Sequence, residues 1–257
     1  LLNIDSLVSK SYFNDIKNYS LLSKIVSKLN PDIIFHLAAQ PLVIESYKKT
    51  VETFDTNIIG TTNLLESIKN NIKSKVKSLI IVTTDKVYDT SQKKSFIESD
   101  RLGASDPYST SKACCELISE SYRKSFLNIK NILATVRAGN VIGGGDYSDN
   151  RLVPDILRAH KSKKELKLRN PNHIRPWQHV FEPLYGYLIL AQKMYQGSLI
   201  NKKPNWNFGP DDSSCKSVKF LTDKFKKKLF IKVKFIKTNS IKENSYLKLN
   251  NNKSKKL

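Results

Sequence analysis

The sequence predicts a doubly wound α/β fold, in which a parallel β-sheet carries helices on both faces. Two observations lead to this prediction. Nearly continuous apolar runs occupy 32–39, 78–83 and 132–137, as expected of strands buried on both faces, and segments with helical periodicity separate them. The 257 residues, 39% of them hydrophobic, are enough to bury a sizeable core.

The helices of the first half are predicted from their boundaries as well as from their periodicity. Helix 19–29 ends before an Asn-Pro pair, because proline disfavours a helical residue in front of it. A second helix is expected at 53–70. Helix 106–125 begins with Ser105 or Asp106 as its N-cap and has a proline in its first turn.

The second half shows a looser pattern after the glycine run 143–145. Helices are expected at 152–161 and 183–196, and the alternation of apolar residues and Lys at 229–237 indicates an exposed strand. The last residues, 250–257, are polar and basic, and we expect them to be frayed.

These patterns suggest two domains of unequal size. We expect residues 1–145 to form the first domain and residues 146–257 a smaller second one, with part of 176–196 packing back on the first. Such a sheet places its ligands at the carboxyl ends of the strands.

The net charge of +21 is spread along the chain rather than patterned. Residues 216–257 hold 14 Lys and two acidic residues, and the whole chain has 37 Lys but only seven Arg. Nucleic-acid surfaces favour clustered Arg with interleaved aromatic residues, so no nucleic-acid partner is expected.

Membrane and metal chemistry are not expected either. The longest apolar runs fall well short of the roughly 20 residues that span a bilayer, and no signal-like segment opens the sequence. Of the three cysteines, Cys114 and Cys115 are adjacent, a spacing that suits neither a disulfide framework nor zinc. We expect packing cysteines, a cytoplasmic location and no metal site.

Tyr108 and Lys112 are the first candidate catalytic pair. Residues four apart share one face of a helix, so the Lys ammonium can lie near the phenol. A nearby positive charge favours the phenolate and could turn Tyr108 into a general base. The alternative is a chance spacing in a chain rich in Tyr and Lys.

Thr84, Asp85 and Lys86 form the second candidate cluster. They follow the predicted strand 78–83, at the carboxyl end where this kind of sheet binds its ligands. A hydroxyl, a carboxyl and an amine side by side could orient a substrate and move protons. The alternative is an ordinary solvated junction between a strand and a loop.

Several motifs occur in one order along the chain, and together they resemble the extended branch of the short-chain dehydrogenase/reductase superfamily. They are HLAAQPLV from His36, Asn57-x-x-Gly-Thr, Thr84-Asp85-Lys86 and Tyr108-x-x-x-Lys112. Longer strings narrow the resemblance to the CDP-glucose 4,6-dehydratase family: AQPLV from Ala39, VRAGNVIGGGD from Val136, RLVPD from Arg151 and IRPWQHV from Ile174. The likeness covers 14–249 and implies a Rossmann-like fold. It also implies that residues 1–145 are an incomplete NAD-binding domain and residues 146–257 the substrate domain.

The resemblance implies an NAD-dependent lyase that converts CDP-glucose to CDP-4-dehydro-6-deoxy-D-glucose. By similarity, Tyr108 takes the proton of the sugar 4-hydroxyl, Lys112 lowers the pKa of Tyr108 and holds the nicotinamide ribose, and Thr84 bonds the 4-oxygen. Asp85 is the implied acid at the C6 hydroxyl. Lys86 is the candidate base at C5, because related dTDP-sugar dehydratases have Glu there.

The resemblance also implies binding residues. Those for NAD are Asp15, Ile16, Ala38, Ala39, Gln40, Asn57, Tyr108 and Lys112. Those for the nucleotide sugar are Asn140, Arg151, Arg175 and Asn207. Arg137 could serve there as well, but for Arg137 and Arg151 a structural ion pair is a nearly equal explanation. His36 is better explained by a satisfied core position. A homodimer is expected.

The sequence departs from the family in one respect, which keeps other interpretations open. No Gly-x-x-Gly-x-x-Gly turn for the NAD pyrophosphate occurs in it, and we expect the first βαβ unit to be missing and the chain to be shortened at both ends. An inactive remnant without cofactor is therefore one alternative. A nucleotide-sugar epimerase is another, although an epimerase does not need the Asp85–Lys86 pair. A basic nucleic-acid binder is the third, disfavoured by the diffuse Lys.

Overall fold

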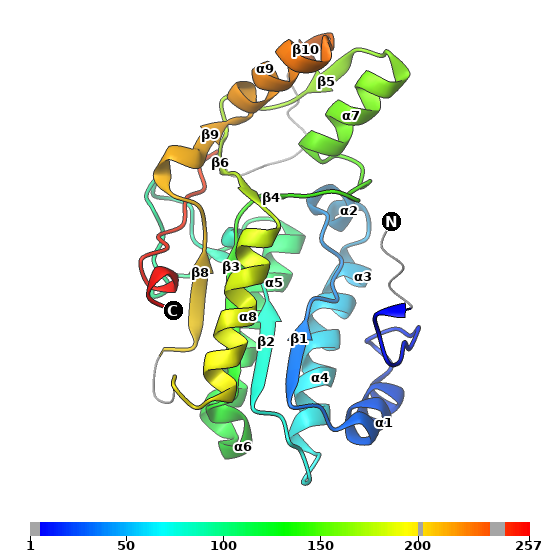
Figure 1. Ribbon diagram of the computed structural model, residues 1–257, viewed down its shortest axis with the longest axis vertical. Coiled ribbons are helices and arrows are strands. Elements are labelled where there is room, and N and C mark those ends of the chain that lie inside the picture. Colours follow the sequence, from blue (N-terminus) through cyan, green and yellow to red (C-terminus); the bar gives the residue numbers. More distant parts are fainter. Residues whose placement is uncertain (1–5, 200–202, 237–244) are drawn as a thin grey trace.

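The computed structural model describes residues 6–199, 203–236 and 245–257. Its centre is a four-stranded parallel sheet with the strand order β1-β2-β3-β8 (Figure 1). The strands are β1 (Ile33–His36), β2 (Ser78–Val82), β3 (Leu133–Ala138) and β8 (Asn205–Phe208). The first three lie within or next to the predicted apolar runs, so the parallel α/β sheet is confirmed.

The side chains of β2 explain why polar and apolar residues do not alternate along this strand. Leu79, Ile80 and Ile81 are fully buried. Successive side chains of a strand point to opposite faces, so Leu79 and Ile81 pack into one core while Ile80 packs into another. The strand is therefore covered on both faces, as the doubly wound fold requires.

Helices fill both faces of the sheet. On one side lie α1 (Tyr19–Leu29), α4 (Gly60–Lys69) and α5 (Pro107–Ser125), followed by the short α6 (Leu127–Lys130). On the other side α8 (Phe181–Tyr195) places Tyr187 and Leu190 against Ile80 (Figure 1).

The helix predicted at 53–70 is confirmed over 53–69, with one departure from regular α-helical geometry. The chain first forms α2 (Val43–Lys48) and α3 (Thr50–Phe54), and a π-helical turn, Asp55–Ile59, then separates α3 from α4. The side chain of Asn57, inside this turn, accepts from the backbone N–H of Gln40 at 2.8 Å and donates to its carbonyl at 3.1 Å. The wider turn accommodates this pairing, which hydrophobic periodicity does not report.

A smaller region lies beyond the carboxyl ends of the strands. It contains α7 (Leu152–Ser162) and α9 (Val218–Leu229) around a core of Ile156, Leu166, Leu168 and Ile231. Three short strand pairs complete it: β4 (Val141–Ile142) with β7 (Gln178–His179), β5 (Leu166–Leu168) with β10 (Val233–Phe235), and β6 (Ile174–Pro176) with β9 (Cys215–Ser217).

The path of the chain between the two regions differs from a simple division at residue 145. Besides α8, strand β8 also returns to the central sheet, where it pairs with β3. We therefore propose that the smaller domain is built from 146–257 without α8, β8 and the residues after Leu247.

Two expectations for the second half need correction. The strand predicted at 229–237 is shorter, because Leu229 still belongs to α9 and only Val233–Phe235 pairs with β5; residue 237 lies outside the described residues.

The last residues are not frayed. Lys253 donates to the carbonyls of Lys203 and Asn205, both at 2.6 Å, and Ser254 donates to that of Asn207 at 2.6 Å.

The ordered end has a plain physical cause. β8 is the outer strand of the sheet, so its outward carbonyls need donors, and the polar side chains of the last residues supply them. Lys253 also lies 3.9 Å from the ring centroid of Trp206, a cation–π contact.

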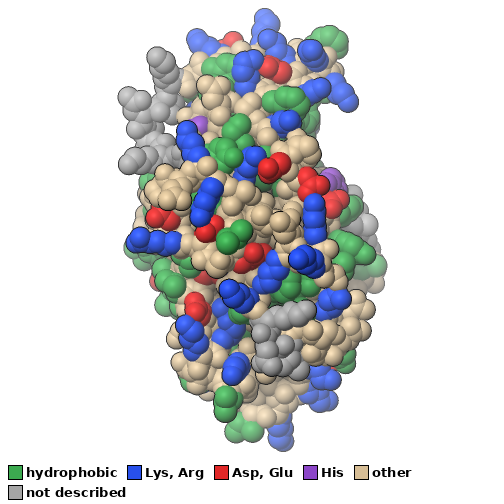
Figure 2. Space-filling view, turned by 90° about the vertical axis from the view of Figure 1, so that its left-hand side faces the viewer, with side chains coloured by type: hydrophobic (Ala, Val, Ile, Leu, Met, Phe, Trp, Pro, Cys, Tyr) green, Lys and Arg blue, Asp and Glu red, His purple; other side chains and the backbone are tan. Residues whose placement is uncertain are grey.

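The surface agrees with the charge pattern of the sequence. Figure 2 shows Lys and Arg side chains scattered among acidic and polar groups on one face, without a continuous basic stripe. No helix in the described part of the chain is long and apolar enough to cross a membrane.

Candidate active site

A cavity of about 730 Å³ opens at the carboxyl ends of β2 and β3, between the central sheet and the smaller region. We call it the main cavity. Its lining includes seven of the predicted site residues: Thr84, Asp85, Lys86, Tyr108, Asn140, Arg151 and Arg175. The glycine run 143–145 also lines it, and Gly145 has a φ of 80°, a conformation that side chains disfavour.

Thr84, Asp85 and Lys86 come to the main cavity on a tight turn directly after β2. Asp85–Val87 is a 3-10 turn with Thr84 as its N-cap, whose hydroxyl accepts from the N–H of Lys86 at 3.4 Å and donates to Asp85 Oδ1 at 3.1 Å. The Nζ of Lys86 lies 3.6 Å from Asp85 Oδ1.

The Asp85 carboxyl has one oxygen left over. Its side chain is 1% exposed, yet Oδ2 has no hydrogen-bond partner among the residues that the structure describes. Buried carboxyl oxygens are normally paired, so an unpaired one beside a cavity is suited to a substrate hydroxyl.

Tyr108 and Lys112 reach the same place from the first turns of α5. The Asp106 side chain caps this helix by accepting from the N–H of Ser109 at 2.9 Å. The hydroxyls of Tyr108 and Thr84 share a hydrogen bond. Lys112 Nζ donates to the carbonyl of Val82 at 2.9 Å, so the ammonium lies under the end of β2 and not in the lining of the main cavity.

The electrostatics of Tyr108 differ from the sequence-based expectation. Burial raises the pKa of Tyr108 to about 12, and the Asp85 charge adds to the rise. The hydrogen bond with Thr84 and the Arg151 charge act in the opposite direction. Lys112 is not among these influences, and burial lowers the pKa of its own ammonium. The expected lowering of the Tyr108 pKa by Lys112 is therefore not found.

The residues predicted to bind NAD that do not belong to α5 fall into two groups, one at the end of β1 with Asn57 and one before α1. Ala38, Ala39 and Gln40 follow the carboxyl end of β1, where Asn57 holds the Gln40 backbone. Asp15 and Ile16 lie before α1. The Asp15 carboxylate is 3.5 Å from Lys17 Nζ, and the Ile16 side chain packs so closely on α4 that a Cβ at Gly60 would lie 2.5 Å from it.

Among the residues predicted for the nucleotide sugar, three line the main cavity and one does not. Arg151 Nη1 lies 3.7 Å from Asp146 Oδ2, and Arg175 Nη2 lies 3.2 Å from His173 Nδ1. The side-chain oxygen of Asn140 is buried with no hydrogen-bond partner in the described ranges.

Asn207 is the exception, because the structure does not place it with the other three. Its side chain is fully buried inside the sheet, where it accepts from the Tyr88 hydroxyl at 2.6 Å and donates to the Phe96 carbonyl at 2.9 Å. Both ends of the amide are thus used by the protein, and Asn207 does not line the main cavity.

Sequence reasoning missed several residues of the site. Lys167, Arg169 and His173 line the main cavity beside Arg175, and Tyr187 reaches it from α8. Arg169 begins an Arg-Asn-Pro string shortly before the IRPWQHV string that supports the family resemblance, and this position is the signal that could have pointed to it. Tyr187 sits in an apolar helical stripe and gave no such signal.

His36 and the cysteines have structural roles. Burial, followed by the Lys112 charge, lowers the pKa of His36 to about 3, so the ring is neutral, and its Nε2 lies 2.9 Å from the Thr61 hydroxyl. Burial raises the pKa of Cys114 and Cys115, which disfavours the reactive thiolate. No cluster of possible metal ligands is found among the described residues.

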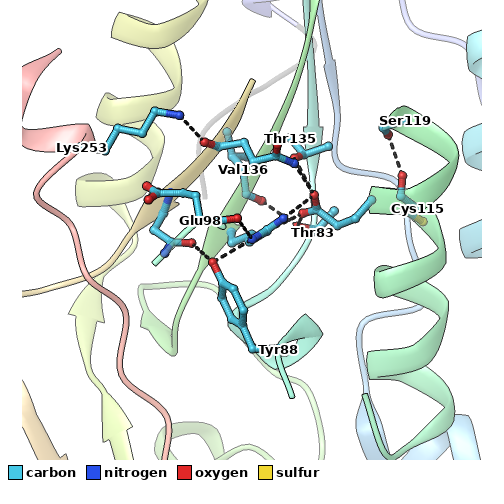
Figure 3. Close-up of polar contacts among 12 residues, drawn as sticks. Thr83, Tyr88, Glu98, Cys115, Ser119, Thr135, Val136 and Lys253 are labelled. Atoms are coloured by element: carbon cyan, nitrogen blue, oxygen red, sulfur yellow. Dashed lines mark hydrogen bonds and ion pairs between the residues drawn. The ribbon is translucent and has the colours of Figure 1, made fainter. Parts of the chain in front are cut away.

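A buried polar network fixes α5 to the sheet next to the site (Figure 3). Its hub is Glu116, one turn beyond Lys112. The Glu116 carboxylate accepts from the hydroxyls of Thr83 at 2.5 Å and Thr135 at 2.7 Å. Arg137 adds two hydrogen bonds, which settles its role as a structural ion-pair partner.

Comparison with known proteins gives a consistent picture. The family model described as GDP-mannose 4,6 dehydratase matches residues 6–210. A CDP-glucose 4,6-dehydratase of Salmonella typhimurium is 44% identical over 223 residues, which cover 84% of this chain and 61% of that protein. A dTDP-D-glucose 4,6-dehydratase of Dictyostelium discoideum is 30% identical over 204 residues, covering 75% of this chain and 45% of that protein. The chain therefore spans less than two thirds of the length of these relatives.

Solved structures share the fold. A dTDP-glucose 4,6-dehydratase from Bacillus anthracis, in complex with NAD, superposes with a TM-score of 0.78 at 23% identity, covering 95% of this chain and 71% of that chain. A UDP-glucuronic acid 4-epimerase from Bacillus cereus, in complex with UDP-glucuronic acid and NAD, gives 0.80 at 23% identity, covering 99% and 78%. The resemblance predicted from the motifs is confirmed.

Proposed function

Because the chain belongs to the GDP-mannose 4,6 dehydratase family, we propose that it catalyses the NAD-dependent dehydration of CDP-D-glucose to CDP-4-dehydro-6-deoxy-D-glucose. The observation that supports the proposal is that Thr84, Asp85, Lys86 and Tyr108 all line one cavity. A hydroxyl, a carboxyl, an amine and a phenol at one place are what an oxidation followed by an elimination needs. The proposed enzyme is a lyase whose product serves cell-surface deoxysugar biosynthesis.

The residues present fit the nicotinamide half of NAD. Ala38 and Ala39 offer small side chains at the carboxyl end of β1, and the buried Lys112 ammonium is the cation suited to the adjacent ribose hydroxyls. When bound, NAD supplies a hydride acceptor for C4 that returns the hydride to C6. The 257 residues contain no glycine-rich turn for its pyrophosphate, so we assign no residue to that half.

Tyr108 is the proposed base for the sugar 4-hydroxyl. Burial keeps its phenol protonated near neutrality, so this proton must pass to solvent through the main cavity, which Tyr108 lines, before the phenolate can accept another. The hydrogen bond with Thr84 and, after it, the Arg151 charge lower the pKa of Tyr108. We propose that Thr84 holds the 4-oxygen while Tyr108 removes its proton.

Asp85 and Lys86 are the proposed pair for the elimination. Once C4 is a ketone, the C5 proton is acidic, and removing it while the C6 hydroxyl is protonated expels water. The unpartnered Oδ2 of Asp85 is suited to protonate that hydroxyl. Lys86 is the base at C5 when its amine is neutral, and its 3.6 Å contact with Asp85 keeps the donor and acceptor of protons adjacent.

Arg151, Arg175 and Asn140 are the proposed contacts for the nucleotide diphosphate. A guanidinium fork can bond two phosphate oxygens at once, and both arginines line the main cavity. Lys167 and Arg169 add positive charge to the same wall, which suits a ligand with two phosphates.

We also propose a cytoplasmic homodimer that needs neither nucleic acid nor membrane. Val51 on α3 and Leu117 on α5 are apolar side chains with 73% and 56% exposure, on helices that pack against each other. An apolar surface of this kind suits burial against a second copy. An epimerase is the weaker alternative, because epimerisation at C4 does not need the acid and the base that Asp85 and Lys86 would supply.

The test is a side-by-side measurement with CDP-glucose, dTDP-glucose and UDP-glucose. Binding is measured by calorimetry, and turnover with added NAD is followed by the absorbance of the keto-sugar product in alkali. The proposal expects CDP-glucose to bind tightest and to be dehydrated, and Tyr108→Phe to bind it without turnover. A preference for dTDP-glucose, or a C4 epimer as the only product, would overturn it.

A further inference from the structure

A second cavity, of about 690 Å³, lies at the opposite end of the sheet from the main cavity. It opens where β3 and β8 begin and where α5 and α8 end (Figure 1). Arg123, in the last turns of α5, lines it. Fifteen residues of helix separate Arg123 from Tyr108, about 22 Å at the usual helical rise, so the second cavity is distinct from the proposed active site.

Arg123 is a buried cation without a matching acid. Its side chain is only 7% exposed, and its Nη1 has no hydrogen-bond partner among the residues that the structure describes. Burying a charge without a paired partner is costly, and native proteins seldom leave a buried guanidinium nitrogen unbonded.

The acidic residues near Arg123 are already engaged. Glu116 uses both of its oxygens for Arg137, at 2.9 Å each. Glu120 holds Lys124 at 2.6 Å. Both carboxylates act on Arg123 through their charge, yet burial outweighs them and lowers the pKa of the guanidinium. An additional acidic group is what this position lacks.

The rest of the lining indicates what would carry that group. Lys124, Lys130 and Lys203 line the wall against one acid, Glu120, so that the charge of the lining is positive. Met194, Leu199 and Trp206 supply apolar surface. A volume of this size falls within the roughly 300–1,000 Å³ of small-molecule sites. The combination favours an anion with an apolar body over a bare inorganic ion.

We propose that the second cavity binds a small organic anion, whose acidic group pairs with Arg123 and whose apolar body lies against Met194, Leu199 and Trp206. The pairing supplies the missing partner of a buried guanidinium, and the charge-assisted hydrogen bond gives the site its preference for acids. This binding is independent of the proposed dehydratase activity, and its test needs no turnover.

The two tryptophans of the chain make the test specific, because Trp177 lines the main cavity and Trp206 the second. In the full chain with Trp177→Phe, Trp206 is the only indole. The probe is anilinonaphthalene sulfonate, an aromatic anion that accepts energy from a nearby Trp and fluoresces when bound. Its uncharged analogue, phenylnaphthylamine, has the same apolar body without the acid.

In this background Arg123→Met is expected to weaken sulfonate binding, measured by energy transfer from Trp206, by about tenfold or more. Binding of the uncharged analogue should change less than about twofold. Lys228→Met, the same loss of charge on the exposed end of α9, should leave both unchanged. Arg123→Lys should restore part of the sulfonate affinity, because it keeps the cation.

Folding is checked on the same samples. Removing an uncompensated buried charge is expected to leave the melting temperature unchanged or to raise it, so Arg123→Met should be folded. Unchanged sulfonate affinity in Arg123→Met would overturn the proposal. So would equal loss of both probes, or energy transfer that requires Trp177.

Discussion

Arg137 holds Glu116 at two points: its Nε and Nη2 each donate to a different carboxylate oxygen, both at 2.9 Å. The side chains are 3% and 1% exposed, so the pair is removed from water. It joins α5 to β3 one helical turn beyond Lys112. The position of α5, which carries Tyr108 and Lys112, therefore depends on a buried ion pair that does not line the main cavity.

Glu116→Gln tests this dependence. Breaking one side of a buried ion pair leaves the other charge uncompensated, and the cost is about 3–5 kcal/mol. We expect urea unfolding to show a loss of this size. Glu120→Gln is the matched control on the same helix, because the exposed Glu120–Lys124 pair contributes about 0.5 kcal/mol or less.

The same variant should change the response to acid. Burial alone would raise the pKa of Glu116, but the hydrogen bonds and charge of Arg137 outweigh it and hold the pKa below its ordinary value. A lowered folded-state pKa stabilises the fold above the unfolded pKa, and this contribution is lost as the pH falls through the folded value. The stability gap between wild type and Glu116→Gln should therefore narrow below about pH 4.5. A gap that stays constant down to acid unfolding would contradict the ion-pair account.

His36 makes a separate contribution at milder pH. Its folded pKa is about 3, against an ordinary value of 6.5, so the unfolded chain takes up the proton first. The contribution of His36 to the free energy of unfolding has its full value above the unfolded pKa, and it falls as the pH drops from 6.5 toward 3. Between about pH 7.5 and about pH 5.5 the loss should be roughly 1.4 kcal/mol.

His36→Gln keeps a polar partner for Thr61 and has no proton to take up. Chemical unfolding of this variant at both pH values should show a smaller loss than wild type by about the same 1.4 kcal/mol. His160→Gln is the control, because it makes the same substitution at an exposed ring on α7 and leaves the surroundings of His36 unchanged. If wild type and His36→Gln lost the same free energy of unfolding between these two pH values, His36 would not be a buried, neutral ring.

Much of the fold could be predicted from the sequence, because a strand that is buried on both faces has a nearly continuous run of apolar residues. The π turn at Asn57 could not, because it depends on a contact with Gln40, 17 residues earlier. The burial of the Asn207 amide away from the main cavity could not be predicted for a similar reason. A motif places the residue in the chain, but the partners Tyr88 and Phe96, more than 100 residues away, decide where its amide points.

The cluster around Asp85 could be predicted because parallel strands bring their carboxyl ends to one edge. The electrostatics of Tyr108 could not. Four-residue spacing puts Lys112 on the same helical face, but the end of β2 offers the Val82 carbonyl, which takes the ammonium instead. Arg151, 43 positions further along the chain than Tyr108, supplies the positive charge that acts on the phenol.

Asp85→Asn tests the proposed acid. The amide fills the same space but has no proton to give to the C6 hydroxyl, so kcat with CDP-glucose should fall by about 10²–10⁴-fold. The KM should change by less than about threefold, because the lost interaction belongs to the transition state. Asp223→Asn, an exposed acid on α9, is the control. A fall in kcat/KM caused by KM alone would assign Asp85 to binding.

Arg175→Lys tests how the diphosphate is held. Lysine keeps the positive charge and loses the planar fork that can bond two phosphate oxygens at once, so binding should weaken even though the cavity keeps its net charge. We expect the Kd for CDP-glucose to rise by about tenfold. The Kd for CDP alone should rise by the same factor, because CDP carries the same two phosphates.

The control for this last substitution is Arg158→Lys, the same change on an arginine that bonds Asp155 on α7 and does not line the main cavity. Its Kd should stay within about twofold of wild type. At saturating CDP-glucose, Arg175→Lys should keep its kcat, because a contact to the remote phosphates acts on ground state and transition state alike. A lower kcat with an unchanged Kd would instead place Arg175 beside the reacting sugar, and the direction of the nucleotide sugar in the main cavity would have to be reversed.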